Sequence, residues 1–233
     1  MARLFGTDGV RGVAGSELTI DMAMKIGSSA AYVLTKNKKE VKVIIGNDGR
    51  ESSYMLVAAL KAGLYSFGVS VLDAGLLPTP AISYLVKYYK MDAGIMVTAS
   101  HNSYEYNGIK IFDSNGYKLP DEIEDEIEKY VREGYKYQVN KMGRPLESRN
   151  FVEDYGNYLL DCLYKYNPNT DFSNLNIVID TANGASSNTS SYIFSKLGCK
   201  YHIINNKPNG TNINNNCGSM HPEGLRQYIL ENK

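Results

Sequence analysis

The stretch VKVIIGNDGRESSYMLVAALKAGLYSFGVSVLDAG, residues 41–75, decides the fold class. Its apolar run over residues 41–45 is typical of a buried strand, and a turn-rich loop over residues 46–50 follows. Residues 54–67 then have apolar side chains at helical spacing, closed by a glycine. A second apolar run over residues 69–72 completes the unit. Strand, helix and strand in this order predict two parallel strands joined by a crossover helix.

The alternation of strands and helices continues along the chain. Helices are predicted over residues 19–36 and over residues 78–89, and a short strand over residues 93–97. The stretch LNIVIDTANGASSNTSSYIFSKLGCKYHIIN, residues 175–205, repeats the order strand, loop, helix, glycine, strand. The pattern therefore predicts an α/β protein of layered helices and mixed sheets, with two similar βαβ-containing domains in tandem.

Residues 134–150 are polar and irregular, and we expect the join between the two domains there. A first domain is placed at residues 1–140 and a second at residues 141–233. In the second domain, helices are predicted from Phe151 and from about Pro222. Two strands and two or three helices cannot cover both faces of a sheet. We therefore expect the second domain to be incomplete and the chain to be an N-terminal portion of a longer protein.

A different pattern follows the strand at residues 93–97. Residues 109–112 and 117–119 have the character of short strands around a turn at residues 113–116, which predicts a hairpin and hence a mixed sheet. A helix beginning at Pro120 comes next, with acidic residues in its first turn. Its glutamates are interpreted as a solvent-exposed face rather than a metal site.

Charge and cysteine content exclude several classes of protein. The chain has 25 Lys and Arg against 25 Asp and Glu, so no basic excess is present to bind a nucleic-acid backbone. No apolar run approaches the roughly 20 residues that span a bilayer, and the first residues lack the apolar stretch of a signal peptide. Three widely separated cysteines indicate reduced thiols in a cytoplasmic protein, with neither nucleic acid nor membrane as a partner.

The stretch GTDGVRG, residues 6–12, is a candidate phosphate cradle. Its three glycines let backbone N–H groups approach an anion, and Arg11 offers a planar fork that matches phosphate oxygens. Thr7 lies in the same loop. The alternative is a solvated N-terminal turn; in either case the stretch is expected to be too flexible and polar for a strand or helix interior. Neither a Walker motif nor G-x-G-x-x-G is present.

The stretch TASHN, residues 98–102, directly follows a predicted strand. Ligands of α/β sheets bind at the carboxyl ends of strands, so Ser100 is a candidate nucleophile or phosphate carrier. A serine hydrolase is disfavoured, because G-x-S-x-G is missing and His101, adjacent in extended backbone, points away from its neighbour. A phosphate carrier instead needs cationic donors and usually a divalent metal. Arg11, His101 and Lys110 are the candidate donors, although Lys110 taken alone is better interpreted as an ordinary outward lysine of a strand.

Cysteines and histidines near the C-terminal end have a spacing that resembles a zinc site. Cys199 and His202 are three residues apart on a predicted strand, so they face opposite ways and cannot easily share a metal. Cys217 and His221 follow an asparagine-rich stretch. We interpret the set as a buried thiol and a hydrogen-bonded loop rather than as a structural zinc site.

Several of these motifs occur together in one known family. GTDGVRG, then TASHN followed by YNGIK, then NCGSMHPEGL, in this order, resemble the α-D-phosphohexomutases. The opening MARLFGTDGVRG and the late NINNNCGSMHPE resemble the bacterial phosphoglucosamine mutase branch. The resemblance runs along almost the whole chain. It implies an isomerase that interconverts glucosamine 6-phosphate and glucosamine 1-phosphate, on the path to UDP-N-acetylglucosamine and the cell wall.

The resemblance also implies roles for single residues. Ser100 matches the serine that carries the phosphoryl group, and His101 and Asn102 match its motif neighbours. Lys110 matches the lysine of general acid/base and electrostatic function, and Arg11 the arginine of the first loop, near the phosphoserine. Thr7 of that loop is grouped with Arg11 and Asn102 as a phosphate-binding residue, and His101 with Ser100 and Lys110 as catalytic.

The family's cofactor and intermediate are likewise implied by resemblance. A Mg²⁺ is expected on the phosphate of Ser100, with three aspartates of a later Asp-Gly-Asp-x-Asp-Arg loop that these residues do not contain. Glucosamine 1,6-bisphosphate is the expected activating intermediate, a sugar phosphate the expected partner, and a homodimer is left open. Residues 1–233 alone are expected to be inactive.

Two points depart from the family or stay undecided by the resemblance. Ser103 stands where the family often has proline directly after the serine motif, which is expected to loosen the loop. Sugar specificity rests on the branch-specific stretches alone. The alternatives are a phosphomannomutase, a phosphoglucomutase, or a non-catalytic module that binds a sugar phosphate.

Overall fold

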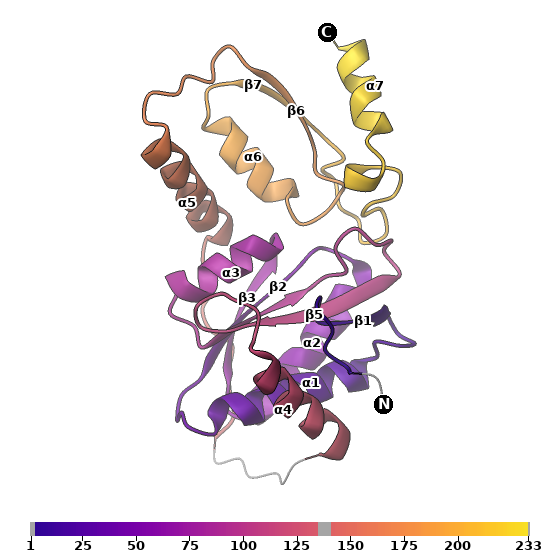
Figure 1. The fold of residues 1–233 in the computed structure, drawn as a ribbon, viewed down its shortest axis with the longest axis vertical. Coiled ribbons are helices and arrows are strands. Elements are labelled where there is room, and N and C mark those ends of the chain that lie inside the picture. The colour runs from indigo at the N-terminus through magenta and orange to yellow at the C-terminus, as the bar shows by residue number, and fades with distance from the viewer. Residues whose placement is uncertain (1–2, 135–140, 233) are drawn as a thin grey trace.

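The computed structural model describes residues 3–134 and 141–232. The strands are β1 (Val10–Val13), β2 (Lys42–Asn47), β3 (Ser70–Leu76), β4 (Ala93–Val97), β5 (Tyr106–Phe112), β6 (Asn176–Asp180) and β7 (Lys200–Ile204). The helices are α1 (Ile20–Thr35), α2 (Glu51–Ser66), α3 (Thr79–Tyr88), α4 (Asp121–Glu133), α5 (Phe151–Tyr166), α6 (Ser187–Ser195) and α7 (Glu223–Glu231), with a 3-10 turn at Gly218–Met220. Figure 1 shows them as a larger first unit, residues 3–134, and a smaller second unit, residues 151–232.

The first unit is built on a five-stranded mixed sheet with the order β1-β5-β4-β2-β3. β2 pairs in parallel with both β3 and β4, as the strand–helix–strand pattern predicts. β5 pairs antiparallel with β4 and with β1. The second unit has a separate parallel pair, β6 and β7. The predicted α/β class, with layered helices and a mixed sheet, is thereby confirmed.

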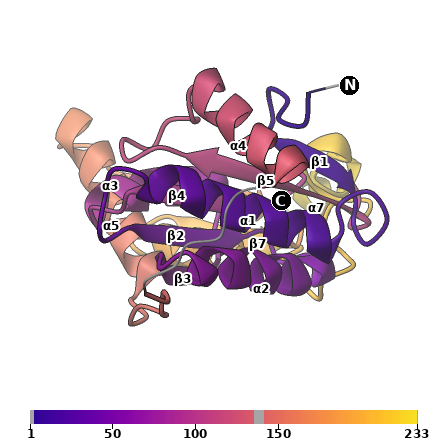
Figure 2. The same cartoon turned by 90° about the horizontal axis from the view of Figure 1, so that it is seen from below.

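One face of the five-stranded sheet is buried under α1, α2 and α4 (Figure 2). Every second residue of the central strands points into this core, including Val43 and Ile45 of β2 and Ile95 and Val97 of β4. α1 and α2 pack closely at Gly63, which lacks a side chain. A Cβ at this position would lie only 2.4 Å from the carbonyl oxygen of Met24. This core makes the sheet a rigid support for the loops at its strand ends.

The other face of the sheet is covered by α3, and α5 of the second unit packs on α3 (Figure 1). Phe151 and Tyr155 of α5 are buried in the same apolar cluster as Ile44 of β2 and Met96 of β4. The two units therefore share a core. Beyond α3 the same face continues over β5 and β1.

The connection between the units follows the edge of the first sheet. The N–H of Val71 donates to the carbonyl of Arg144 at 3.0 Å, and the N–H of Leu146 donates to the carbonyl of Val71 at 2.8 Å. Residues 135–140, which precede the predicted boundary between positions 140 and 141, lie outside the described residues. The boundary stays a prediction.

Two expectations about the first unit are wrong. The glycine-rich stretch at residues 6–12 was expected to be unsuited to a strand, but Val10–Val13 forms β1, because β5 offers it a free edge and Val10 packs opposite Ile109. Residues 117–119 are not a strand; a single bridge joins Lys118 to Phe112, beyond the stretch of β5 that pairs with β1. The predicted hairpin is therefore only a closed turn.

The interpretation of α4's glutamates as a solvent-exposed face also needs a correction. The side chain of Glu124 is 1% exposed and accepts a hydrogen bond from Lys118 at 2.7 Å. Arg3 lies 3.7 Å away on the same carboxylate. The helix therefore carries one buried, compensated carboxylate that anchors the N-terminal segment.

None of the helices described here has both the length and the apolar character needed to cross a membrane. Cys162, Cys199 and Cys217 are all free thiols.

Candidate active site

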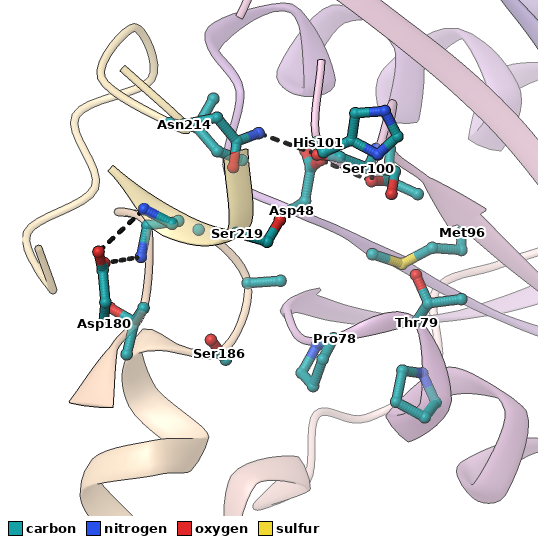
Figure 3. Close-up of a pocket in the computed structure, with 18 residues that line it drawn as sticks. Asp48, Pro78, Thr79, Met96, Ser100, His101, Asp180, Ser186, Asn214 and Ser219 are labelled. Carbon is teal, nitrogen blue, oxygen red and sulfur yellow. Dashed lines mark hydrogen bonds between the residues drawn. The ribbon is translucent and has the colours of Figure 1, made fainter. Parts of the chain in front are cut away.

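A cavity of about 390 Å³ lies between the two units, at the carboxyl ends of β2, β4 and β6 (Figure 3). Because β2 and β4 are parallel neighbours, the loops that follow them emerge side by side, the usual position of a ligand site in an α/β sheet. The first unit lines the cavity with Asp48, Pro78, Thr79, Pro80, Met96, Thr98, Ser100 and His101. The second unit contributes Asp180, Thr181, Ala182, Gly184, Ala185, Ser186, Ile213, Asn214, Gly218 and Ser219.

Ser100 is exposed in a turn directly after β4, with its backbone in the left-handed region at φ 59°. Its N–H donates to the hydroxyl of Thr98 at 2.9 Å, and its own hydroxyl has no hydrogen-bond partner among the described residues. A side-chain-bearing residue in this region is disfavoured by about 1 kcal/mol, and such residues cluster at functional sites. The backbone is not extended here, so the geometric argument that separated Ser100 from His101 was wrong; both line the cavity.

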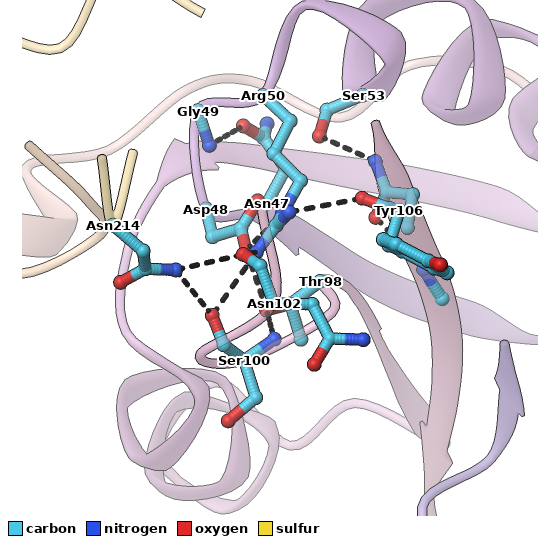
Figure 4. Close-up of polar contacts among 12 residues, drawn as sticks. Asn47, Asp48, Gly49, Arg50, Ser53, Thr98, Ser100, Asn102, Tyr106 and Asn214 are labelled. Carbon is cyan, nitrogen blue, oxygen red and sulfur yellow. Dashed lines mark hydrogen bonds and ion pairs between the residues drawn. The ribbon is translucent and has the colours of Figure 1, made fainter. Parts of the chain in front are cut away.

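Arg50 is fully buried and holds the backbone of this turn (Figure 4). Its Nε–H donates to Oδ2 of Asp48 at 2.9 Å. The other donors reach the carbonyls of Ser100, Asn102 and Tyr106, each at 3.0 Å, and that of Ser103. A guanidinium has five N–H groups, and all five are used. Arg50 thus fixes the whole loop between β4 and β5, including the carbonyl of the residue that stands at the family's proline position.

Asp48 connects this arginine to the strand end. Its Oδ2 also accepts a hydrogen bond from the hydroxyl of Thr98 at 2.6 Å, and Thr98 in turn holds the N–H of Ser100. Its Oδ1 is buried and has no partner among residues 3–134 and 141–232, and Asp48 is one of the residues that line the cavity. Asp48, Arg50 and Thr98 therefore form one buried network under Ser100, with one free acceptor.

The second unit reaches the same turn through Asn214. Its side-chain amide donates to the carbonyls of Ser100 and Asn102, both at 2.9 Å. Nearby, the N–H of Glu51 at the start of α2 donates to the carbonyl of Gly210 at 3.0 Å. These contacts make the cavity a joint product of both units.

Arg11 and Lys110 lie on the same face of the sheet as the cavity residue Met96, but neither is among the residues that line the cavity. Lys110 is paired in register with Met96, and Arg11 with Gly108, which places all four on one face. Asp8 sits 3.5 Å from the Arg11 guanidinium and 3.5 Å from the Lys110 ammonium. The Nε of Arg11 is buried without a partner among the described residues. The structure thus brings the two predicted cations together, with Asp8 between them.

Thr7 lies in an exposed tight turn, in which Gly6 and Gly9 exchange two backbone hydrogen bonds of 3.1 Å. It is not part of the cavity lining. Asn102 contributes its carbonyl to the Arg50 and Asn214 contacts described above. Of the predicted residues, Ser100 and His101 therefore line the cavity directly.

The second unit's side of the cavity is made by the loop after β6 and the start of α6. The Asp180 carboxylate accepts the N–H groups of Ala182 at 2.8 Å and of Gly218 at 2.9 Å. Burial raises the pKa of the Cys217 thiol, and the nearby negative charge of Asp180 raises it further. Across the described part of the chain, no group of three or more His, Cys, Asp or Glu residues is placed to hold a metal ion.

Three residues of the site were missed from the sequence: Asp48, Arg50 and Asn214. Asp48 and Arg50 stand in a stretch that was interpreted only as a turn, and the local sequence does not show that the two charges are buried against each other. Asn214 lies among seven asparagines of residues 205–216, where composition does not distinguish it from its neighbours.

The sequence of this chain is similar to those of known sugar-phosphate mutases. The profile of phosphoglucomutase/phosphomannomutase, alpha/beta/alpha domain I, matches residues 2–138. Phosphoglucosamine mutase of Clostridium novyi is 46% identical over 235 residues, 99% of this chain and 51% of that protein. The enzyme of that name from Clostridium perfringens is 44% identical over 237 residues, 100% of this chain and 52% of that protein.

A solved structure of a phosphoglucomutase/phosphomannomutase family protein from Burkholderia thailandensis matches with a TM-score of 0.78 at 27% identity. The match covers 98% of this chain and 49% of that chain. The chain spans about half the length of the curated relatives it matches.

Proposed function

The chain belongs to the phosphoglucomutase/phosphomannomutase family, and on that basis we propose that its protein interconverts hexose 6-phosphates and 1-phosphates through a phosphoserine at Ser100. The observation that carries the proposal is the turn at Ser100. The backbone of Ser100 is in a disfavoured conformation and is held by the buried Arg50. Its hydroxyl is exposed, has no hydrogen-bond partner among the described residues, and belongs to a residue that lines the cavity. That arrangement suits a group that must present a phosphoryl group rigidly to a substrate.

In the proposed reaction the phosphoryl group leaves the Oγ of Ser100 and bonds to the free hydroxyl of the sugar monophosphate. The product is a sugar bisphosphate and an unmodified serine: the sugar hydroxyl gives its proton to a nearby base, and the Oγ of Ser100 takes up a proton from the acid, Lys110, as its bond to phosphorus breaks. The bisphosphate then reorients, and the Oγ of Ser100 takes the other phosphoryl group. No net phosphate is consumed. Lys110 is the proposed acid/base, with His101 as a further catalytic residue at the cavity.

Arg11 and Lys110 are proposed to stabilise the transferring phosphate, together with Thr7 and Asn102. A phosphoserine carries close to two negative charges at neutral pH, so it needs cations nearby. In the present structure Asp8 occupies both cations at 3.5 Å. Such partly exposed ion pairs are weak, so a phosphate can replace Asp8 at little cost.

Glucosamine phosphate is the proposed substrate, and glucosamine 1,6-bisphosphate the intermediate, on the path to UDP-N-acetylglucosamine. The support is the name of the relatives that match 99% or more of this chain. A phosphomannomutase or phosphoglucomutase is the alternative within the family. Domains at residues 1–140 and 141–233, and a cytoplasmic location, stay predictions.

Mg²⁺ is proposed to bind the phosphate of Ser100. The residues described here do not form a complete site for it, since they contain no carboxylate cluster of the kind Mg²⁺ requires. We therefore assign none of its carboxylate ligands to this chain and derive no step through it. The isolated chain is accordingly expected to bind Mg²⁺ far more weakly than the complete protein and to have no measurable mutase activity.

Phosphopeptide mapping and coupled assays on the complete protein test the proposal. We expect phosphate on Ser100, turnover of glucosamine phosphates above mannose and glucose phosphates, and no turnover in Ser100→Ala. Full activity in Ser100→Ala, with phosphate mapped to Ser103, would overturn the assignment. Binding of a sugar phosphate without turnover would favour a non-catalytic module instead.

A further inference from the structure

The carbonyl groups of Ser100 and Asn102 are each held from two sides (Figure 4). From the first unit, the Arg50 guanidinium donates to both at 3.0 Å. From the second unit, the Asn214 amide donates to both at 2.9 Å. A carbonyl oxygen has two lone pairs, so both acceptors are saturated. The backbone on either side of His101 is thus clamped by donors from two different units.

The orientation of the Asn214 amide is fixed by its partners. Its two N–H groups meet two carbonyl oxygens, and the reversed orientation would set its own oxygen against both. The backbone of Asn214 is itself in the left-handed region, at φ 57°, where asparagine is tolerated better than most residues. Its N–H donates to the carbonyl of Ala182 at 3.0 Å. Asn214 is therefore anchored in the second unit and cannot simply follow the turn.

The hydrogen bonds from Arg50 and Asn214 stabilise the backbone of Ser100, whose φ of 59° is unfavourable for a residue with a side chain. Such a conformation persists only when its surroundings determine it. Arg50 is sealed in the core of the first unit, whereas Asn214 comes from across the cavity that the substrate would enter. The direction of the Ser100 hydroxyl therefore depends on contacts from both units.

We propose that Asn214 is a positioning residue for phosphoryl transfer, which fixes the turn that presents Ser100. The inference rests on the proposed phosphoserine function and adds to it a residue of the second unit. Asn214 touches the backbone of the turn rather than its hydroxyl, so it acts through Ser100. A small displacement of a reacting group can cost up to about 100-fold in rate.

The test compares two substitutions in the complete protein. Asn214→Gly removes the amide but keeps a residue that accepts positive φ. Asn215→Gly is the matched control: the same exchange, at an exposed neighbour whose side chain has no hydrogen-bond partner among the described residues. Asn214→Asp is a second variant, which keeps the size of the side chain but replaces the donor with an acceptor facing two carbonyls.

For Asn214→Gly we expect kcat to fall about tenfold with KM within about twofold of wild type, while Asn215→Gly stays at wild-type rates. Asn214→Asp is expected to fall at least as far. Amide hydrogen exchange should become faster in residues 99–103 and stay unchanged in β4.

Equal kcat in Asn214→Gly and Asn215→Gly would overturn the proposal. So would a loss that appears only as a lower unfolding midpoint, with normal kcat for the folded fraction, because that is a structural role alone. Failure of the proposed function is recognised separately: the wild-type complete protein would then show neither mutase turnover nor phosphate on Ser100, whatever the variants do.

Discussion

Two loops at corresponding positions of the repeated unit lie on opposite sides of the cavity (Figure 3). Each follows a parallel strand and each carries an aspartate, Asp48 after β2 and Asp180 at the end of β6. Asp48 is 3% exposed and pairs with the buried Arg50 guanidinium. Asp180 is half-buried and accepts two backbone N–H groups instead.

The difference shows that one sequence pattern can be stabilised in two ways. The first loop is locked by a charge pair inside a complete core, since β2 has strands on both sides and helices on both faces. The second loop is held by peptide dipoles beside a two-stranded sheet whose residues are mostly half-buried. We therefore expect the first loop to act as the rigid side of the cavity and the second as the adjustable side.

The largest expected effect comes from removing the buried cation. Arg50→Met should lower the free energy of unfolding by about 3–5 kcal/mol, because it leaves the Asp48 carboxylate buried without its partner. Arg226→Met, the same exchange at an exposed position of α7, should change it by less than about 0.5 kcal/mol. Urea unfolding measures both. Equal effects of the two substitutions would break the comparison.

The next effect concerns rate rather than stability. Arg11→Ala and Lys110→Ala in the complete protein should fold normally and lose about 100-fold in kcat/KM, equivalent to about 2.7 kcal/mol of transition-state stabilisation. Lys129→Ala, on the exposed face of α4, is the control. Lys118 is unsuitable as a control, because it compensates the buried Glu124. Comparable activity in all three variants would contradict the assignment of both cations.

On the second unit's side, Asp180→Asn should cost only about 1–2 kcal/mol of unfolding free energy. The amide keeps one acceptor for a backbone N–H but turns its NH₂ toward the other. The measurement is the same urea titration. A loss as large as that of Arg50→Met would mean that both loops are locked alike.

The smallest expected effect tests the contact between the units. The rings of Tyr84 in α3 and Tyr158 in α5 are stacked with centroids 3.8 Å apart. A double-mutant cycle with Tyr84→Ala and Tyr158→Ala should give a coupling energy of about 0.5–1.5 kcal/mol. A coupling near zero would show that α5 does not contribute to the first unit's stability through this pair.

Elements bounded by local signals were predictable from the sequence. β4 was predicted with its observed bounds, and the strands that begin and end the predicted repeat of residues 175–205 are β6 and β7, because each is an apolar run between turn residues. The start of α1 was also predicted, since Thr19 caps it through a hydrogen bond from the N–H of Met22. In these segments, local sequence and final packing favour the same structure.

Elements stabilised by distant partners were not predictable in the same way. β1 overlaps the glycine-rich stretch of residues 6–12, and it becomes a strand because β5, about a hundred residues later, offers it an edge. The role of Arg50 was not predictable for the same reason, because most of its hydrogen-bond acceptors are carbonyls about fifty residues later, within residues 100–106. The family resemblance located Ser100, but not the network beneath it, because that network is defined only by three-dimensional contact.

At Ser100 the residue that gives the highest stability differs from the residue that the proposed function requires. At φ 59° the residue that the backbone prefers is glycine, so Ser100→Gly should be more stable than Ser100→Ala, by about 1 kcal/mol, and equally unable to carry phosphate. Selection for stability alone would favour glycine at this position. A serine at this position therefore lowers stability in exchange for its hydroxyl. Among related sequences, the frequency of serine relative to glycine at this turn would measure selection for the chemistry of that hydroxyl.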